Sequence, residues 1–201
     1  QQTYGVNSHV IAYGGDHAID CDAAPVDDLD LPENYALAIG RVEPENNAAM
    51  MLEAFASDSS RSLVAVGNWQ RTKYGRSLVR RYAGNPQIRL LEPIYDLGRL
   101  KALRAGARLY VHGHSAGGTN PSLVEAMQFG IPVFAYDCVF NRSSTEERAL
   151  FFRTSTELRA LLDKVDEATL AQVANDMQAI ARRRYTWSAV ADQYYALLDR
   201  V

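Results

Sequence analysis

The chain has 201 residues, of which 47% are apolar and 22% charged, values typical of a globular protein with room for one α/β domain. Its formal net charge of −3 argues against nucleic acid or an anionic membrane surface as the main partner. The two cysteines, Cys21 and Cys138, match no metal or redox spacing and fit a reducing compartment. No apolar run approaches the roughly 20 residues that cross a bilayer, so we expect a cytoplasmic protein without a membrane span.

A short strand is expected over residues 8–13, followed by an Asp- and Pro-rich surface connection over 17–34. Residues 35–39 and 62–66 are continuous apolar runs, which strands covered on both faces require. The later expected strands are 88–91, 108–112, 131–136 and 150–152. The expected helices are 46–55, 74–83, 97–105, one that begins at Pro121 and ends at Gly130, 155–164, 167–184 and 188–201.

Strands that alternate with helices of this length predict βαβ units, and therefore an α/β, doubly wound, parallel-sheet domain of Rossmann-like fold. Ligands bind such sheets beyond the carboxyl ends of the strands, near the switch in strand order. The residues that directly follow the expected strands are therefore the candidates for a binding site. They are Gly40-Arg41, Gly67 to Trp69, Glu92 to Ile94, Gly113 to Pro121 and Asp137-Cys138.

The segment 111–137 combines a strand, a glycine-containing loop and a helix. Glycines at 117 and 118 let main-chain N–H groups approach a ligand without a Cβ in the way. Asn120 is a good N-cap before Pro121, and a helix N-terminus favours an anion. The physics thus indicates a phosphate-bearing ligand, with a tight structural turn as the alternative. The segment has neither the dinucleotide fingerprint nor a Walker loop.

The residues Asn120-Pro-Ser-Leu-Val-Glu-Ala-Met127, followed by Gly130-Ile-Pro-Val133, resemble the donor-site signature of family 4 glycosyltransferases of the GT-B architecture. The segment 38–47 and Tyr185-Thr-Trp-Ser188 are similar to two further motifs of that family, in the same order. The resemblance implies the C-terminal, nucleotide-sugar-binding half of a retaining glycosyltransferase. It also implies that no cofactor is needed, and the absence of an Asp-x-Asp element implies metal-independent transfer.

The resemblance also assigns roles to individual residues. Glu125 would hold the ribose hydroxyls of the donor, and Arg41 would be catalytic by offsetting the charge that develops on the leaving diphosphate. The expected substrate-binding residues are Gly40, Arg41, Lys73, Ile94, His114, Gly117, Gly118, Thr119, Asn120 and Glu125.

Each of these roles has a simpler alternative. Arg41 could pair with Glu43 or Glu45, Lys73 could be a solvated residue at a helix start, and Ile94 could serve core packing. A tight turn explains the glycines, and Glu125 alone could be a surface helix residue. His112 and His114 have a spacing that could suggest a metal, but no third ligand is in sight, so hydrogen-bonded histidines are expected instead.

Two residues depart from the family pattern. Gly117 stands where the family usually has a Glu, eight residues before Glu125, and Asn46 stands where it usually has a Lys. Lys73 could supply the positive charge that Asn46 lacks. The form with Gly117 resembles bacterial enzymes assigned as rhamnosyltransferases of polysaccharide synthesis, which favours a dTDP-linked deoxyhexose such as rhamnose over a UDP- or GDP-linked sugar.

Residues 1–201 are expected to form a single donor-binding domain. Residues 1–10 resemble the tail of an interdomain connection, and the helix 188–201 would return toward an N-terminal acceptor domain that is absent here. We expect such a fragment to bind donor but to be inactive alone, and the full-length enzyme to be cytoplasmic, at most peripheral to the inner membrane face. The alternatives are a sugar-nucleotide epimerase or a phosphorylase of the same architecture, and a degenerate, non-catalytic binding module.

Overall fold

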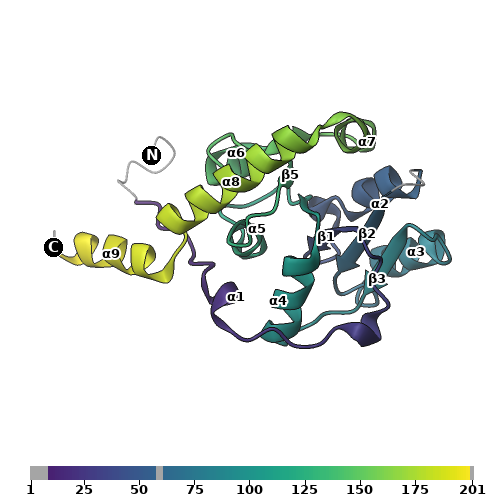
Figure 1. Ribbon diagram of the computed structural model, residues 1–201, viewed down its shortest axis with the longest axis horizontal. Coiled ribbons are helices and arrows are strands. Elements are labelled where there is room, and N and C mark those ends of the chain that lie inside the picture. The colour runs from purple at the N-terminus through teal and green to yellow at the C-terminus, as the bar shows by residue number, and fades with distance from the viewer. Residues whose placement is uncertain (1–8, 58–60, 200–201) are drawn as a thin grey trace.

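A parallel sheet lies at the centre of the computed structural model, which describes residues 9–57 and 61–199 (Figure 1). Its six strands within this described part run in the order β3-β2-β1-β4-β5-β6. The strands are β1 (Tyr35–Ile39), β2 (Ser62–Val66), β3 (Ile88–Leu91), β4 (Leu109–His112), β5 (Val133–Tyr136) and β6 (Leu150–Phe152). The order reverses between β1 and β4, which makes that point the topological switch of a doubly wound sheet. The predicted α/β fold is confirmed.

Helices cover both faces of the sheet (Figure 1). One apolar core lies under α2, α3 and α7, and the other lies under α4, α5 and the middle of α8. The helices are α1 (His17–Asp20), α2 (Ala48–Ala56), α3 (Lys73–Tyr82), α4 (Leu97–Gly106), α5 (Pro121–Met127), α6 (Val139–Ser144), α7 (Ser155–Lys164), α8 (Glu167–Arg184) and α9 (Trp187–Leu198), with 3-10 turns at Asp27–Leu29 (η1) and Pro44–Asn46 (η2).

The continuous apolar sequence of β1 has a direct structural cause. Tyr35 and Leu37 pack into the core under α4 and α5, whereas Ala36 and Ala38 pack into the core under α2 and α3. Successive side chains of a strand point to opposite faces, so a strand covered on both sides must be apolar at every position.

Three local expectations need correction. Residues 9–13 form no strand; His9, Val10 and Ile11 instead line a small groove together with residues of α9. The connection 17–34 contains α1 and η1. Helix α6 was not expected, because a six-residue helix is too short to show a periodic pattern. Residues 1–8 of the proposed interdomain tail lie outside the described residues.

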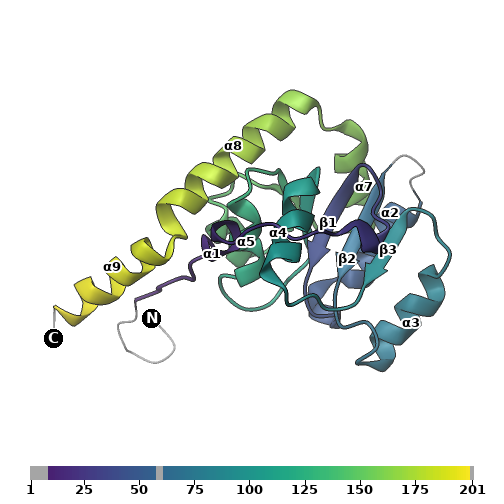
Figure 2. The same cartoon turned by 60° about the horizontal axis from the view of Figure 1, so that its bottom comes forward.

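The C-terminal helix α9 extends away from the sheet (Figure 2). Along it Tyr194, Tyr195 and Leu198 are more than half exposed, whereas Val190 is buried. Large apolar side chains therefore gather in solvent along this helix. No helix within residues 9–57 and 61–199 is both long and apolar enough to cross a membrane.

Candidate functional site

A cavity of about 400 Å³ opens at the carboxyl ends of β1 and β4, where the strand order reverses. Its volume lies in the range of small-molecule sites. Its polar lining comes from the loops after β1 and β4 and from the first turns of α5. The lining includes Gly40, Arg41, Asn46, His112, His114, Asn120, Ser122 and Glu125, with Val42, Met51 and Trp69 at the apolar wall.

The start of α5 is held by its own N-cap. The Oδ1 atom of Asn120 accepts hydrogen bonds from the Ser122 amide at 3.0 Å and the Ser122 hydroxyl at 2.9 Å. Its carbonyl accepts the amides of Leu123 and Val124, both at 3.2 Å. Since Pro121 has no N–H, the first turn offers no free donor. The amides of Ser122, Leu123 and Val124 are therefore used by Asn120 and are not open to a ligand.

Open main-chain donors lie one step earlier, in the loop between β4 and α5. The amides of Gly117, Gly118 and Thr119 form no hydrogen bond with any described residue. Gly117 has a φ of 106°, a backbone conformation that side-chain-bearing residues avoid. The loop thus keeps open amides directly before Asn120, although these three residues do not themselves line the cavity.

The loops after β1 and β4 are tied together by side chains. Nδ1 of His114 makes a short hydrogen bond with Oδ1 of Asn46, whose Nδ2 atom donates to the carbonyl of Arg41 at 2.6 Å. Asn47 donates to the Gly113 carbonyl at 2.8 Å, and the amide of Ser115 donates to the Glu45 carbonyl at 2.9 Å. Asn46, at the position of the family's usual Lys, therefore serves to join the two loops.

Burial disfavours the charged form of both histidines of this region. Burial, and then the nearby His114, lower the pKa of His112 to about 3; His112 is only 3% exposed, and its Nε2 atom has no partner among the described residues. Burial, and then the charge of Arg41, lower the pKa of His114. Within the described chain, no group of three His, Cys, Asp or Glu side chains could hold a metal ion.

Arg41 is exposed at the rim of the cavity. Within the described residues its guanidinium forms no ion pair, so neither Glu43 nor Glu45 neutralises it. It lies close enough to His114 to lower the pKa of that side chain. A cation without a carboxylate partner at the mouth of a cavity is suited to an anionic ligand.

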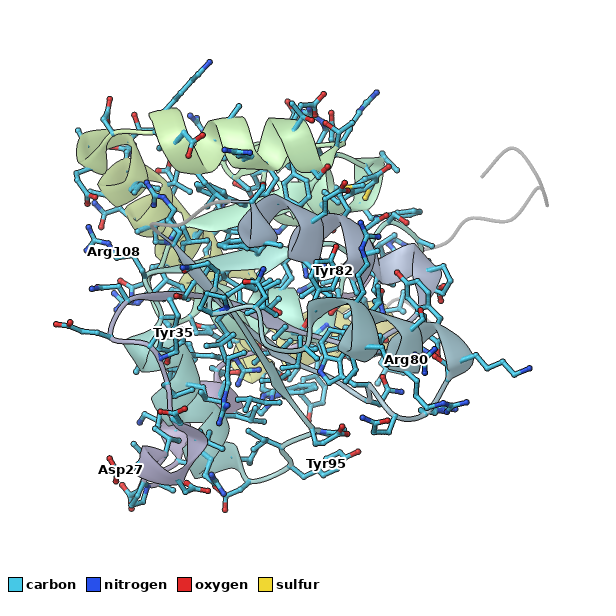
Figure 3. The ribbon with its side chains drawn as sticks, turned by 90° about the vertical axis from the view of Figure 1, so that its right-hand side faces the viewer. Asp27, Tyr35, Arg80, Tyr82, Tyr95 and Arg108 are labelled. Carbon is cyan, nitrogen blue, oxygen red and sulfur yellow. The ribbon has the colours of Figure 1, made fainter. Side chains whose placement is uncertain are left out.

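Five expected site residues do not line this cavity: Lys73, Ile94 and the three loop residues Gly117, Gly118 and Thr119. Lys73 is exposed as the first residue of α3 and does not line the cavity. Ile94 is half-buried and packs against the core under α4, which agrees with the alternative that it serves core packing. The neighbouring Tyr95 is 87% exposed on the turn after β3 (Figure 3).

Glu125 lines the cavity from α5, and two side chains that were not expected hold it. Its Oε2 atom forms a short ion pair with Nη2 of Arg104 on α4, and its Oε1 atom lies 3.3 Å from Nε2 of His17 on α1. The side chain of Arg104 is only 2% exposed. A buried Arg must find a carboxylate, but the sequence does not show that Arg104 is buried, since α4 has no clear apolar face that would separate buried from exposed positions.

Comparisons with known proteins agree with this geometry. The sequence profile of the family described as "Glycosyl transferases group 1" matches residues 24–184. No curated protein sequence matches the chain. Among solved structures, HepE of Anabaena in complex with UDP-glucose is similar, with a TM-score of 0.73 and 21% identity over 84% of this chain and 49% of that one.

Sucrose-phosphate synthase from Thermosynechococcus elongatus superposes with a TM-score of 0.74 and 21% identity, over 94% of this chain and 49% of that one. The C-terminal domain of LpcC, a glycosyl transferase group 1 family protein from Francisella tularensis, has a TM-score of 0.67 and 16% identity, over 85% of this chain and 98% of that one. The chain therefore spans about half the length of the two larger proteins and corresponds in extent to an isolated C-terminal domain.

Proposed function

Since this chain belongs to the family of glycosyl transferases group 1, we propose that its β1–β4 cavity binds a nucleoside diphosphate sugar as the donor of a glycosyl transfer. The observation that carries the proposal is the grouping of three complementary features at one switch point. Arg41 lines the cavity and forms no ion pair with any described residue, and Glu125 is a carboxylate on the first turns of α5. Directly before α5, the loop 117–119 has amides that no described residue accepts.

Each feature matches one part of such a donor. A diphosphate carries negative charge that Arg41 and main-chain amides can hold together, and the same contacts strengthen as charge develops on the leaving group. A carboxylate such as Glu125 accepts hydrogen bonds from the two ribose hydroxyls of UDP or GDP, or from the single 3′-hydroxyl of the deoxyribose of dTDP. Arg41 is thus the proposed catalytic residue, and the proposed transfer is retaining and independent of metal.

The proposed donor sugar is a hexose or a deoxyhexose such as rhamnose, destined for a bacterial glycan. UDP and UDP-glucose are the compounds named for the HepE structures, which supports UDP as well as dTDP as the nucleotide to test. Gly117 leaves the sugar end of the loop without the family's usual carboxylate. A smaller or less hydroxylated sugar suits that arrangement.

The acceptor site is proposed to belong to a second, N-terminal domain. The chain covers about half of HepE and of sucrose-phosphate synthase, and its α9 carries exposed apolar side chains that a further domain could cover. We therefore expect residues 1–201 to bind donor as one domain and to transfer sugar poorly by themselves.

A non-catalytic binding module is the second candidate, and one observation favours it. Asn46 stands where the family usually has a Lys, and its side-chain amide is hydrogen-bonded to His114 and to the Arg41 carbonyl. No second cation therefore lies beside Arg41 among the described residues that line the cavity. Such a module would bind the nucleotide sugar without promoting transfer.

Calorimetric titration with UDP, GDP and dTDP tests the proposal directly. At least one nucleotide should bind, and both Arg41→Ala and Glu125→Ala should weaken that binding about tenfold or more, as expected for a lost hydrogen bond to a charged group. Arg80→Ala, at an exposed position of α3 (Figure 3), is the matched control and should bind normally. Absence of binding to all three nucleotides contradicts the proposal.

A further inference from the structure

The carboxylate of Glu125 is shared between two side chains, one on each oxygen. Arg104 pairs with Oε2 through Nη2 alone, while His17 approaches Oε1 at 3.3 Å. The Nε atom of Arg104, which points to the same side as Nη2, is buried and has no partner among the described residues. The ion pair is therefore single, although Arg prefers to pair with a carboxylate through two parallel hydrogen bonds.

The tautomer of His17 is set by Trp187. The indole Nε1–H of Trp187 lies 3.1 Å from Nδ1 of His17. Because an indole nitrogen can only donate, Nδ1 must be the accepting nitrogen, and the proton of the neutral ring is on Nε2. This Nε2–H is the group that faces Oε1 of Glu125. Trp187, His17 and Glu125 thus form one directed chain of donors and acceptors.

The backbone around His17 is held in place by neighbours far away in sequence. The amide of Gly15 donates to the Tyr185 carbonyl at 2.7 Å, and Asp16 accepts the Trp187 amide at 2.9 Å. A Cβ at Gly15 would come within 2.7 Å of the Val124 carbonyl oxygen on α5. A side chain at this position would therefore push α1 off α5.

The far end of α1 is anchored as well. Lys101 on α4 donates to the carbonyls of Ile19 and Cys21 at 2.9 and 2.8 Å. Helix α1 has only four residues and could not hold a fixed position alone. These anchors place the imidazole of His17 beside Glu125, on the opposite side from Arg104.

We propose that His17, oriented by Trp187, is a positioning residue that keeps Glu125 available for the ribose hydroxyls of the donor; this inference rests on the proposed function. Without His17, the Oε1 atom is free to turn onto the unpaired Nε–H of Arg104, and the carboxylate becomes bidentate on the guanidinium. Both oxygens would then face Arg104 instead of the cavity. His17 prevents this by holding Oε1 away from Arg104.

If this role of His17 is correct, its loss should weaken nucleotide binding without lowering the free energy of unfolding. Loss of His17 removes a half-exposed contact but lets the buried Nε–H of Arg104 find an acceptor, so the folded state is not weakened. A merely structural role for His17 predicts instead that stability and binding fall together.

The test compares His17→Ala with the unmodified chain, using whichever of UDP, GDP and dTDP binds best and the same nucleotide without its ribose hydroxyls. His17→Ala should bind the parent nucleotide about tenfold more weakly and the deoxygenated nucleotide as well as the unmodified chain does. The midpoint of thermal unfolding should stay unchanged or rise. His17→Gln, which retains a donor N–H, should recover part of the affinity.

Trp187→Phe gives an independent check, since it removes the indole donor and keeps a ring against Gly14. Trp187→Phe should lose less affinity than His17→Ala does. The two losses should not add in the double variant, because both substitutions break the same hydrogen-bonded chain from Trp187 through His17 to Glu125. Three results for His17→Ala would overturn the inference without affecting the proposed donor site. They are an equal loss of affinity for both nucleotides, no loss of affinity, and a loss of affinity accompanied by a lower unfolding midpoint. Failure of the unmodified chain to bind any of the three nucleotides overturns both proposals.

Discussion

Asn46 and His114 are bonded side chain to side chain across the mouth of the cavity, although 68 residues separate them. Because the amide of Asn46 also donates to the Arg41 carbonyl, its oxygen is the atom that faces His114. The proton of the neutral imidazole is therefore on Nδ1, and Nε2 is left as an acceptor near Gly117. The residue that replaces the family's usual cation has a defined structural task.

Asn46→Lys is predicted to remove the hydrogen bonds that join the two loops and to add a positive charge beside Arg41. A second cation beside Arg41 should tighten nucleoside diphosphate binding, most clearly at low salt. The two lost side-chain hydrogen bonds should lower the free energy of unfolding by about 1–2 kcal/mol. Calorimetry at two salt concentrations and urea unfolding measure both effects. Ser57→Lys, at an exposed position beyond the end of α2, supplies the same charge elsewhere, and equal tightening by both variants would contradict the prediction.

Gly117→Ala is predicted to destabilise the loop. Its φ of 106° is strained for any residue with a Cβ, and that Cβ would lie 3.4 Å from Nε2 of His114. A loss of about 1 kcal/mol or more in the free energy of unfolding follows. Gly118→Ala is the matched control, since a Cβ there meets no atom within 4 Å and its φ is not in the left-handed region. Equal stability of the two variants would show that the strain is absent.

The low pKa of His112 predicts a loss of stability in mild acid. The folded-state pKa is about 3, below the ordinary value of 6.5, so the unfolded chain binds a proton first as the pH falls. The contribution of His112 is complete above pH 6.5 and declines below it, by up to about 1.4 kcal/mol per pH unit. Urea unfolding between pH 8 and pH 5 measures the slope. His112→Gln should make the decline shallower, and parallel curves would refute this account.

Tyr185→Phe is predicted to separate stability from binding. The Tyr185 hydroxyl is buried and donates to the Ser144 carbonyl at 2.8 Å, so its removal should cost about 1–2 kcal/mol of unfolding free energy. Nucleotide affinity should not change, because neither Tyr185 nor Ser144 lines the cavity. Tyr194→Phe, at a position 54% exposed on α9, should alter neither quantity. A loss of affinity in Tyr185→Phe would give the tyrosine a role beyond packing.

The layout of the sheet could be predicted because its signals are local. The run Tyr35–Ile39 is apolar at every position, which only a strand covered on both faces tolerates, and Asn120 with Pro121 marks the start of α5. The prediction of a strand at residues 8–13 was wrong because a local signal does not show what a segment packs against. A short apolar run looks alike whether it pairs with a sheet edge or lies against a helix.

Sequence alone determined which loops would meet, since parallel strands bring their carboxyl ends to one edge, and it therefore located Arg41 and His114 beside one cavity. The resemblance to the glycosyltransferase signature added Glu125. Only the tertiary structure decided which side chains complete the site. Arg104 and His17 reach Glu125 from α4 and α1, at separations of 21 and 108 residues, through contacts that no local pattern encodes. Such pairings depend on how helices pack against the sheet and against one another. A buried charge pairs with the counterion that this packing brings within reach, and residue spacing along the chain does not reveal which one that is.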